Sequence, residues 1–88
     1  MANHASAIKR AKQNEKRRMA NKAVRTRVRN AIKTVRQALE SKDAEQAQSA
    51  LKQAVSVIDK AAGKGVVHDN AASRQVSRLS RQVHDLTA

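Results

Sequence analysis

Proline is absent from this 88-residue chain, and its two glycines, Gly63 and Gly65, lie almost together. The residues that most strongly interrupt helices are therefore confined to one point of the sequence. Alanine, arginine, lysine and glutamine, which all favour helices, are abundant elsewhere. Aromatic residues and cysteine are absent, so neither disulfides nor thiolate metal sites can form. We expect an all-α fold in a reducing compartment.

Apolar residues recur with helical spacing in three segments of the sequence. In the first segment the apolar stripe starts only at Val24, although helix-favouring residues extend much further toward the N-terminus. Asn3 or Ser6 is the expected N-cap of this first helix, and its expected end is near Glu40. We therefore predict a first helix that is amphipathic only in its second half.

A short turn at residues 41–43 separates the first helix from the second. Asp43 and Gln46 have the spacing of a capping box, in which two side chains bond the free amides at a helix start. Gly63 is the expected C′ residue, the position just beyond the end of the second helix. The next loop is expected to cover residues 63–70.

Val66 and Val67 in that loop are expected to pack at the base of the fold. The third helix then repeats apolar residues from Ala72 to Leu86 at alternating spacings of four and three. Because both connections are short, the three helices predict an antiparallel bundle. Large apolar side chains are few, so we expect marginal stability that a bound partner would raise.

The first helix is too long for such a bundle. At 1.5 Å per residue it would measure about 55 Å, whereas the other two would measure about 25–28 Å. We predict a single domain in which residues 1–22 form a protruding basic helical arm and residues 23–88 form the bundle. The arm has basic side chains on all sides, so we expect residues 1–20 to fray in the free protein and to become helical within a nucleic acid.

Nearly all of the formal net charge of +12 comes from residues 1–36, which contain twelve Lys or Arg and one acid, Glu15. Residues 37–88 contain seven basic and six acidic residues. Such a dense block of like charge is typical of an arm that binds a polyanion. The candidate contacts in this block are Lys9, Arg10, Lys12, Lys16, Arg17, Arg18, Lys22, Arg25, Arg27, Arg29, Lys33 and Arg36.

Part of this block forms a stripe on the helix that the bundle includes. Five cations lie within an arc of about 80°, roughly opposite the apolar stripe: Lys22, Arg25, Arg29, Lys33 and Arg36. This arrangement predicts a helix with protein on one side and a polyanion on the other.

The third helix has a smaller basic stripe, formed by Arg74, Arg78 and Arg81. Each lies two residues from a core position, about 200° away from it around the helix. By itself this stripe is equally consistent with a solvated face. The charge of the arm, together with His68 and Asn70 at a helix start whose amides can bind phosphates, favours contact with the polyanion.

Several classes of function lack the residues they need. The chain has no apolar stretch long enough for a membrane span and no apolar segment of a secretory signal. The histidines have no metal-ligand spacing, and the residues around Lys64 lack the glycine pattern of a phosphate-binding loop. We expect neither an enzyme nor a site for a cofactor, a metal or a small-molecule substrate. Without aromatic rings to stack bases, the chain has to bind phosphates and sugars and recognise the shape of a folded nucleic acid.

Two motifs resemble a known family. Residues 1–10, MANHASAIKR, with EKRR at 15–18 and NK at 21–22, look like the start of the bacterial small-subunit ribosomal protein family numbered twenty in the S series. Residues 64–74, KGVVHDNAASR, followed by SRL at 77–79, resemble the loop-to-helix signature of that family. The resemblance covers essentially the whole chain. It implies a three-helix bundle with an extended first helix, bound to 16S rRNA as an early assembly protein of the cytoplasmic ribosome.

The resemblance also implies particular RNA contacts: the basic residues of 9–36, with Ser6, His68, Asn70, Arg74 and Arg78. Asp69 stands where the family usually has lysine, and Gln75 and Val76 replace a typical basic pair. These departures weaken the case for RNA contact by the third helix. The partner is then small-subunit rRNA, with few contacts to other ribosomal proteins, no membrane and no homo-oligomer.

Two alternatives fit parts of the sequence. A non-specific, nucleoid-type DNA-binding protein would have the same charge, but duplex DNA engages one face of a helix and leaves the all-round display unexplained. An amphipathic helix on a membrane surface would need bulky apolar residues opposite the lysines, and residues 9–22 offer only Met19.

Overall fold

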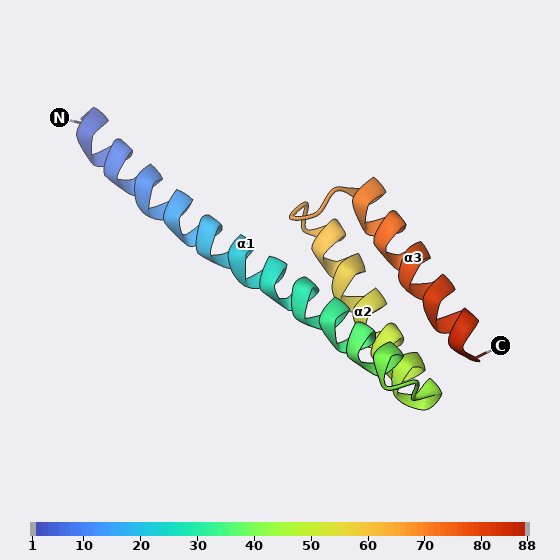
Figure 1. The fold of residues 1–88 in the computed structure, drawn as a ribbon. Helices are drawn as coiled ribbons and strands as arrows, with labels where there is room; N and C mark the ends of the chain where they lie inside the picture. Colours follow the sequence, from blue (N-terminus) through green and yellow to red (C-terminus); the bar gives the residue numbers. More distant parts are fainter. Residues whose placement is uncertain (1, 88) are drawn as a thin grey trace.

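Three α-helices make up the computed structural model, which describes residues 2–87 and the surroundings of the side chains from residue 4 onward. The helices are α1 (Ala2–Glu40), α2 (Ala44–Gly63) and α3 (Asp69–Thr87), and no strand occurs in residues 2–87. α2 runs back along α1, and α3 runs back along α2 (Figure 1). The predicted all-α, three-helix bundle is confirmed.

α1 extends far beyond the bundle (Figure 1). It has 39 residues, against 20 in α2 and 19 in α3, and the molecule measures 66 × 22 × 14 Å. Residues 4–23 are all exposed, and Val24 is the first half-buried side chain of α1. The bundle therefore begins where the apolar stripe of the sequence begins. Asn3 and Ser6, the expected caps, both lie inside α1, which starts at Ala2.

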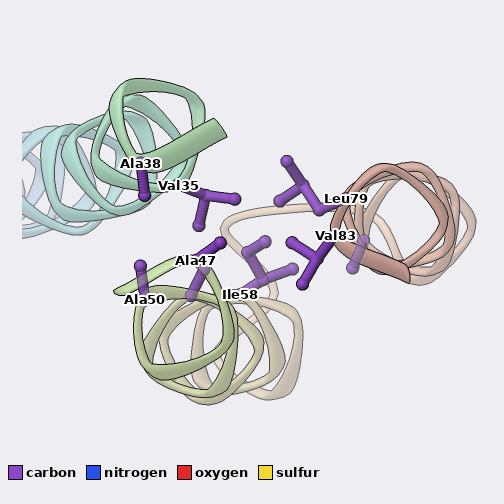
Figure 2. Close-up of a cluster of buried hydrophobic side chains, with 9 residues drawn as sticks. Val35, Ala38, Ala47, Ala50, Ile58, Leu79 and Val83 are labelled. Carbon is purple, nitrogen blue, oxygen red and sulfur yellow. The ribbon is translucent and has the colours of Figure 1, made fainter. Parts of the chain in front are cut away.

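The core between the helices is small and rich in alanine. Its largest fully buried side chains are Val35, Ile58 and Leu79, one from each helix. These side chains point into the space between the three helices (Figure 2). Most of the residues that α2 buries are alanines, whose small side chains allow neighbouring helices to approach closely: Ala47, Ala50, Ala54 and Ala61.

The turn between α1 and α2 is closed by backbone hydrogen bonds. The N–H of Lys42 donates to the carbonyl of Leu39, and the N–H of Asp43 donates to that of Ala38, both at 3.2 Å. This is a Schellman motif, and it places Lys42 at φ 58°, in the left-handed region that glycine usually occupies. The lysine accepts this conformation because the hydrogen bonds and the packing of two helices determine the path of the chain.

Asp43 is the N-cap of α2, as the sequence predicts. Its Oδ1 atom accepts a hydrogen bond from the N–H of Gln46 at 3.2 Å. In the expected capping box the side chain of Gln46 would also accept a hydrogen bond from the N–H of Asp43. That N–H donates to the carbonyl of Ala38 instead. The side chain of Asp43 therefore caps α2, and the Schellman motif satisfies the N–H of Asp43.

The predicted C′ role of Gly63 is wrong. α2 continues through Gly63, and Gly65 is the residue with left-handed backbone, at φ 77°. The N–H of Gly65 donates to the carbonyl of Ala62 and that of Val66 to Ala61, both at 3.0 Å. These bonds form a second Schellman motif, and glycine enters the left-handed region there without a steric penalty.

α3 begins at Asp69, earlier than the sequence analysis placed it. His68 explains the difference, because its Nδ1 atom accepts the N–H of Asn70 at 3.1 Å and its carbonyl accepts that of Ala72 at 2.9 Å. A histidine therefore caps this helix, although serine, threonine, aspartate and asparagine are the usual N-caps.

The loop between α2 and α3 is consequently shorter than expected, covering residues 64–68 instead of 63–70. Val67 packs against the core, and Val66 is half-buried. The predicted position at the base of the bundle is confirmed for Val67, which closes the end of the core opposite the first turn.

Replacing each glycine by alanine separates their roles. Gly63→Ala should raise the free energy of unfolding by about 0.5–1 kcal/mol, because alanine favours a helix and nothing lies within 4 Å of the new Cβ. Gly65→Ala should lower it by about 1–2 kcal/mol, because a side chain is strained at φ 77°. Thermal unfolding followed by circular dichroism measures both changes. Effects of the same sign would contradict the assignment of Gly65 as the C′ residue.

Lys42→Gly should stabilise the protein for the same reason. Removing the side chain from a left-handed residue should raise the free energy of unfolding by about 0.5–1 kcal/mol, and the melting temperature by several degrees. Lys52→Gly, in the exposed interior of α2, is the matched control and should lower the stability by about 1 kcal/mol. A loss of stability in both variants would show that Lys42 is not strained.

Candidate nucleic-acid interface

The first half of α1 presents positive charge around its whole circumference. Lys16, Arg17 and Arg18 follow one another, so at 100° per residue these three alone span about 200° of the helix. All the predicted arm residues are exposed: Ser6, Lys9, Arg10, Lys12, Lys16, Arg17, Arg18 and Lys22. The arm therefore leaves no face on which a neighbouring helix of the same chain could pack.

These charges are almost uncompensated within the chain. Arg18 Nη2 lies 3.1 Å from Glu15 Oε1, and this is the only ion pair among the side chains that the structure describes. Both side chains are exposed, at 78% and 58% respectively, so the pair contributes little to stability. The other cations of α1 are left free to bind an external anion.

Repulsion between neighbouring cations opposes the helix in this segment. Lys12 and Lys16, and likewise Arg18 and Lys22, are four residues apart and lie on the same face. Each such pair costs a few tenths of a kcal/mol, and no packing in the bundle offsets it, since residues 4–23 are exposed. A polyanion that neutralises the charges would therefore stabilise the arm as a helix.

Within the bundle, the basic stripe of α1 borders a groove on the side of α3. We call it the α1/α3 groove, and its lining residues come from α1 with a single contribution from α3: Arg25, Val28, Arg29, Ile32, Lys33, Arg36 and Gln75. The predicted position of this stripe, roughly opposite the apolar stripe, is wrong. The cations lie directly beside Val28 and Ile32, because at 100° per residue Arg25 and Ile32 are only about 20° apart around α1. α3 packs less extensively against α1 than α2 does and leaves this flank open.

Arg27 lies on the other flank of α1. It lines a second hollow together with Lys60, in the last turn of α2, and Lys64, the first residue of the loop that follows. These two lysines were not among the residues predicted from the sequence. Their spacing of four residues at the end of a helix is the signal that could have identified them, although Lys60 also compensates the helix dipole in the last turn of α2.

α3 presents Arg74, Arg78 and Arg81 on its exposed surface, as the sequence predicts. Val76 is half-buried and packs against the core, in agreement with its assignment to the apolar stripe. The residue of α3 that enters the α1/α3 groove is Gln75, which the sequence analysis had treated only as a lost basic position.

The start of α3 offers less to an anion than the sequence suggested. The N–H of Asn70 is already bonded to the ring of His68, so this amide is not free to bind a phosphate. Asp69 occupies the first turn of α3, where the positive end of the helix dipole already stabilises its carboxylate. His68 and Asn70 are themselves exposed, so their side chains remain candidates for contact.

The described residues form neither a metal site nor a membrane-spanning helix. No group of three His, Cys, Asp or Glu side chains comes together in a way that could hold a metal ion. None of the three helices combines the length and apolar character needed to cross a membrane.

The sequence also matches a known protein family. The family model of ribosomal protein S20 matches residues 2–84. The chain belongs to the ribosomal protein S20 family. The small ribosomal subunit protein bS20 of Geobacter metallireducens is 55% identical over 86 residues, which cover 98% of this chain and 99% of that protein. The protein of the same name from Oleidesulfovibrio alaskensis is 59% identical over 83 residues, covering 94% and 95%.

The match to the S20 family includes all of the candidate interface. Residues 2–84 contain the exposed arm, the α1/α3 groove and the basic stripe of α3. The match therefore spans both the bundle and the long cationic helix.

Salt should stabilise the helix of the free arm, although it weakens RNA binding. In the free protein, backbone amides of residues 5–20 should exchange with solvent much faster than those around Val35, because no tertiary contact protects them. Raising the salt concentration from about 50 to about 500 mM should slow exchange in the arm by screening the repulsion. Hydrogen exchange read by NMR measures this; arm amides as protected as those of the core would refute fraying.

Proposed function

We propose that this chain is a structural, non-catalytic protein of the small ribosomal subunit that binds 16S rRNA directly and stabilises its fold during early assembly. The single observation that carries the proposal is the exposed helix of residues 4–23, which is cationic on all sides and projects from the bundle. A helix that is polar all round is explained by a surrounding partner. The relatives described above are named as proteins of the small subunit.

The proposed arm and bundle are separated at the point where burial begins, at Val24. Residues 1–22 would be the arm embedded in RNA, and residues 23–88 the bundle that anchors it. An arm with cations on all sides can neutralise phosphates of more than one RNA helix at once, and would thereby hold separate segments in register. Phosphate contacts fix position without reading sequence, so recognition would rest on the shape of the folded RNA.

The residues proposed to contact rRNA share exposure and a side chain that donates hydrogen bonds to phosphate or sugar. They are Ser6, Lys9, Arg10, Lys12, Lys16, Arg17, Arg18, Lys22, Arg25, Arg27, Arg29, Lys33, Arg36, His68, Asn70, Arg74, Arg78 and Arg81. In this proposal the protein acts as a monomer in the cytoplasmic ribosome, with rRNA as its main partner and few contacts to other ribosomal proteins.

Salt dependence tests the arm quantitatively. If eight cations contact phosphates, log K for 16S rRNA should fall against log salt with a slope of about −6 to −7. Six of the cations lie in residues 9–18, and changing all six to glutamine keeps a helix-favouring side chain at each position. This variant should lose about 4 to 5 units of the slope, because six contacts are removed at about 0.7–0.9 each; filter binding measures the change, and the remaining slope reports the cations of the bundle.

Deletion of residues 2–20 is the second variant and should flatten the slope to the same extent, while circular dichroism shows that the bundle stays helical. An unchanged slope in both variants would refute the role of the arm. Equal affinity of the unaltered chain for 16S rRNA and for duplex DNA would instead favour a nucleoid-type DNA-binding protein.

A further inference from the structure

The α1/α3 groove has features that the arm lacks, and they point to a more defined ligand. We propose that this groove seats one sugar–phosphate strand of the RNA, with its phosphates along the cations of α1 and its riboses against Val28 and Ile32. The inference rests on the proposed function, because it specifies which part of the RNA the bundle holds.

The cations of the groove form a regular ladder. Arg25, Arg29, Lys33 and Arg36 follow one another at intervals of four, four and three residues, which correspond to rises of about 6, 6 and 4.5 Å along the helix axis. Charges repeated along a line suit the successive phosphates of a single strand. Each cation is exposed, so a strand could reach all of them without a change in the fold.

The groove also has a floor and a second wall. Val28 and Ile32 are half-buried and give it an apolar floor against which the carbon atoms of a ribose can pack. Gln75 of α3 forms the facing wall, and its side-chain amide can donate to a phosphate oxygen or accept from a ribose 2′-OH. No acidic residue lines the groove, so the whole surface favours a negatively charged strand.

Negative charge at one end of the groove determines where the proposed strand leaves it. Arg36 is shared with the next hollow between α1 and α3, whose lining also includes Glu40 and Asp85. Two carboxylates at that point oppose a continued line of phosphates. The proposed strand therefore runs from the arm side, past Arg25, and leaves the protein near Arg36.

Charge changes at Gln75 test the proposal with the full-length chain and 16S rRNA. Gln75→Glu should weaken binding about tenfold and make the salt slope shallower by about 1, whereas Gln75→Lys should tighten binding several-fold. Gln48 is exposed on α2, which contributes no residue to this groove, so Gln48→Glu and Gln48→Lys are matched controls and should each change affinity less than about twofold. Circular dichroism should give the same helix content for all four variants.

Opposite signs for the two Gln75 variants, with small effects at Gln48, would support the strand. Weaker binding in both Gln75 variants would show that the position matters through shape alone and would overturn the proposal. Affinities at Gln75 that match those of the Gln48 controls would also overturn it, as expected if an acidic protein segment occupied the groove. In that case the variant with six glutamines in residues 9–18 still tests the proposed function separately, since the loss of salt slope in that variant depends on the arm and not on the groove.

Discussion

Electrostatic repulsion within α1 is the constraint on which the rest of the structure depends. A helix of 39 residues contains the twelve cations of the N-terminal block, and Glu15 forms the only ion pair found among the described side chains. Packing supports this helix only from Val24 onward. The remaining turns gain nothing from the bundle, so external negative charge would add to their stability as a helix. Under the proposed function, binding of rRNA and stabilisation of the arm helix would therefore be coupled.

The bundle is correspondingly modest. Its three largest fully buried side chains, Val35, Ile58 and Leu79, come from different helices, and alanines fill most of the face that α2 buries. Small side chains let α2 approach α1 closely, whereas α3 packs on α1 less extensively. This asymmetry leaves a groove on one flank of α1, and the cations of the stripe border it. The weaker packing of α3 on α1 therefore gives the basic stripe of α1 a groove beside it, where a flat charged face would otherwise stand.

Much of the architecture could be predicted from the sequence because its signals are local. The helical period, the N-cap Asp43 and the start of the apolar stripe at Val24 each depend on neighbours within about one turn. The left-handed residues could not be assigned in this way. Gly63 and Gly65 are both plausible helix ends by type, and only the register of the backbone hydrogen bonds selects Gly65. Lys42 adopts the same conformation against its preference, because the packing of α1 on α2 determines the turn.

The sequence by itself determined the composition of the arm, its charge and the absence of any apolar face on it, since these follow from residue type and a 100° period. The same period places Arg25 about 20° from Ile32, so the stripe borders the apolar residues whatever the packing. The tertiary structure decided that α3 faces this flank of α1. A helical period relates each side chain only to others on the same helix, and it contains no information about which flank a second helix will cover. The places of Gln75 in the groove and of Lys60 and Lys64 beside Arg27 were decided in the same way, because residues distant in sequence meet only when the helices pack.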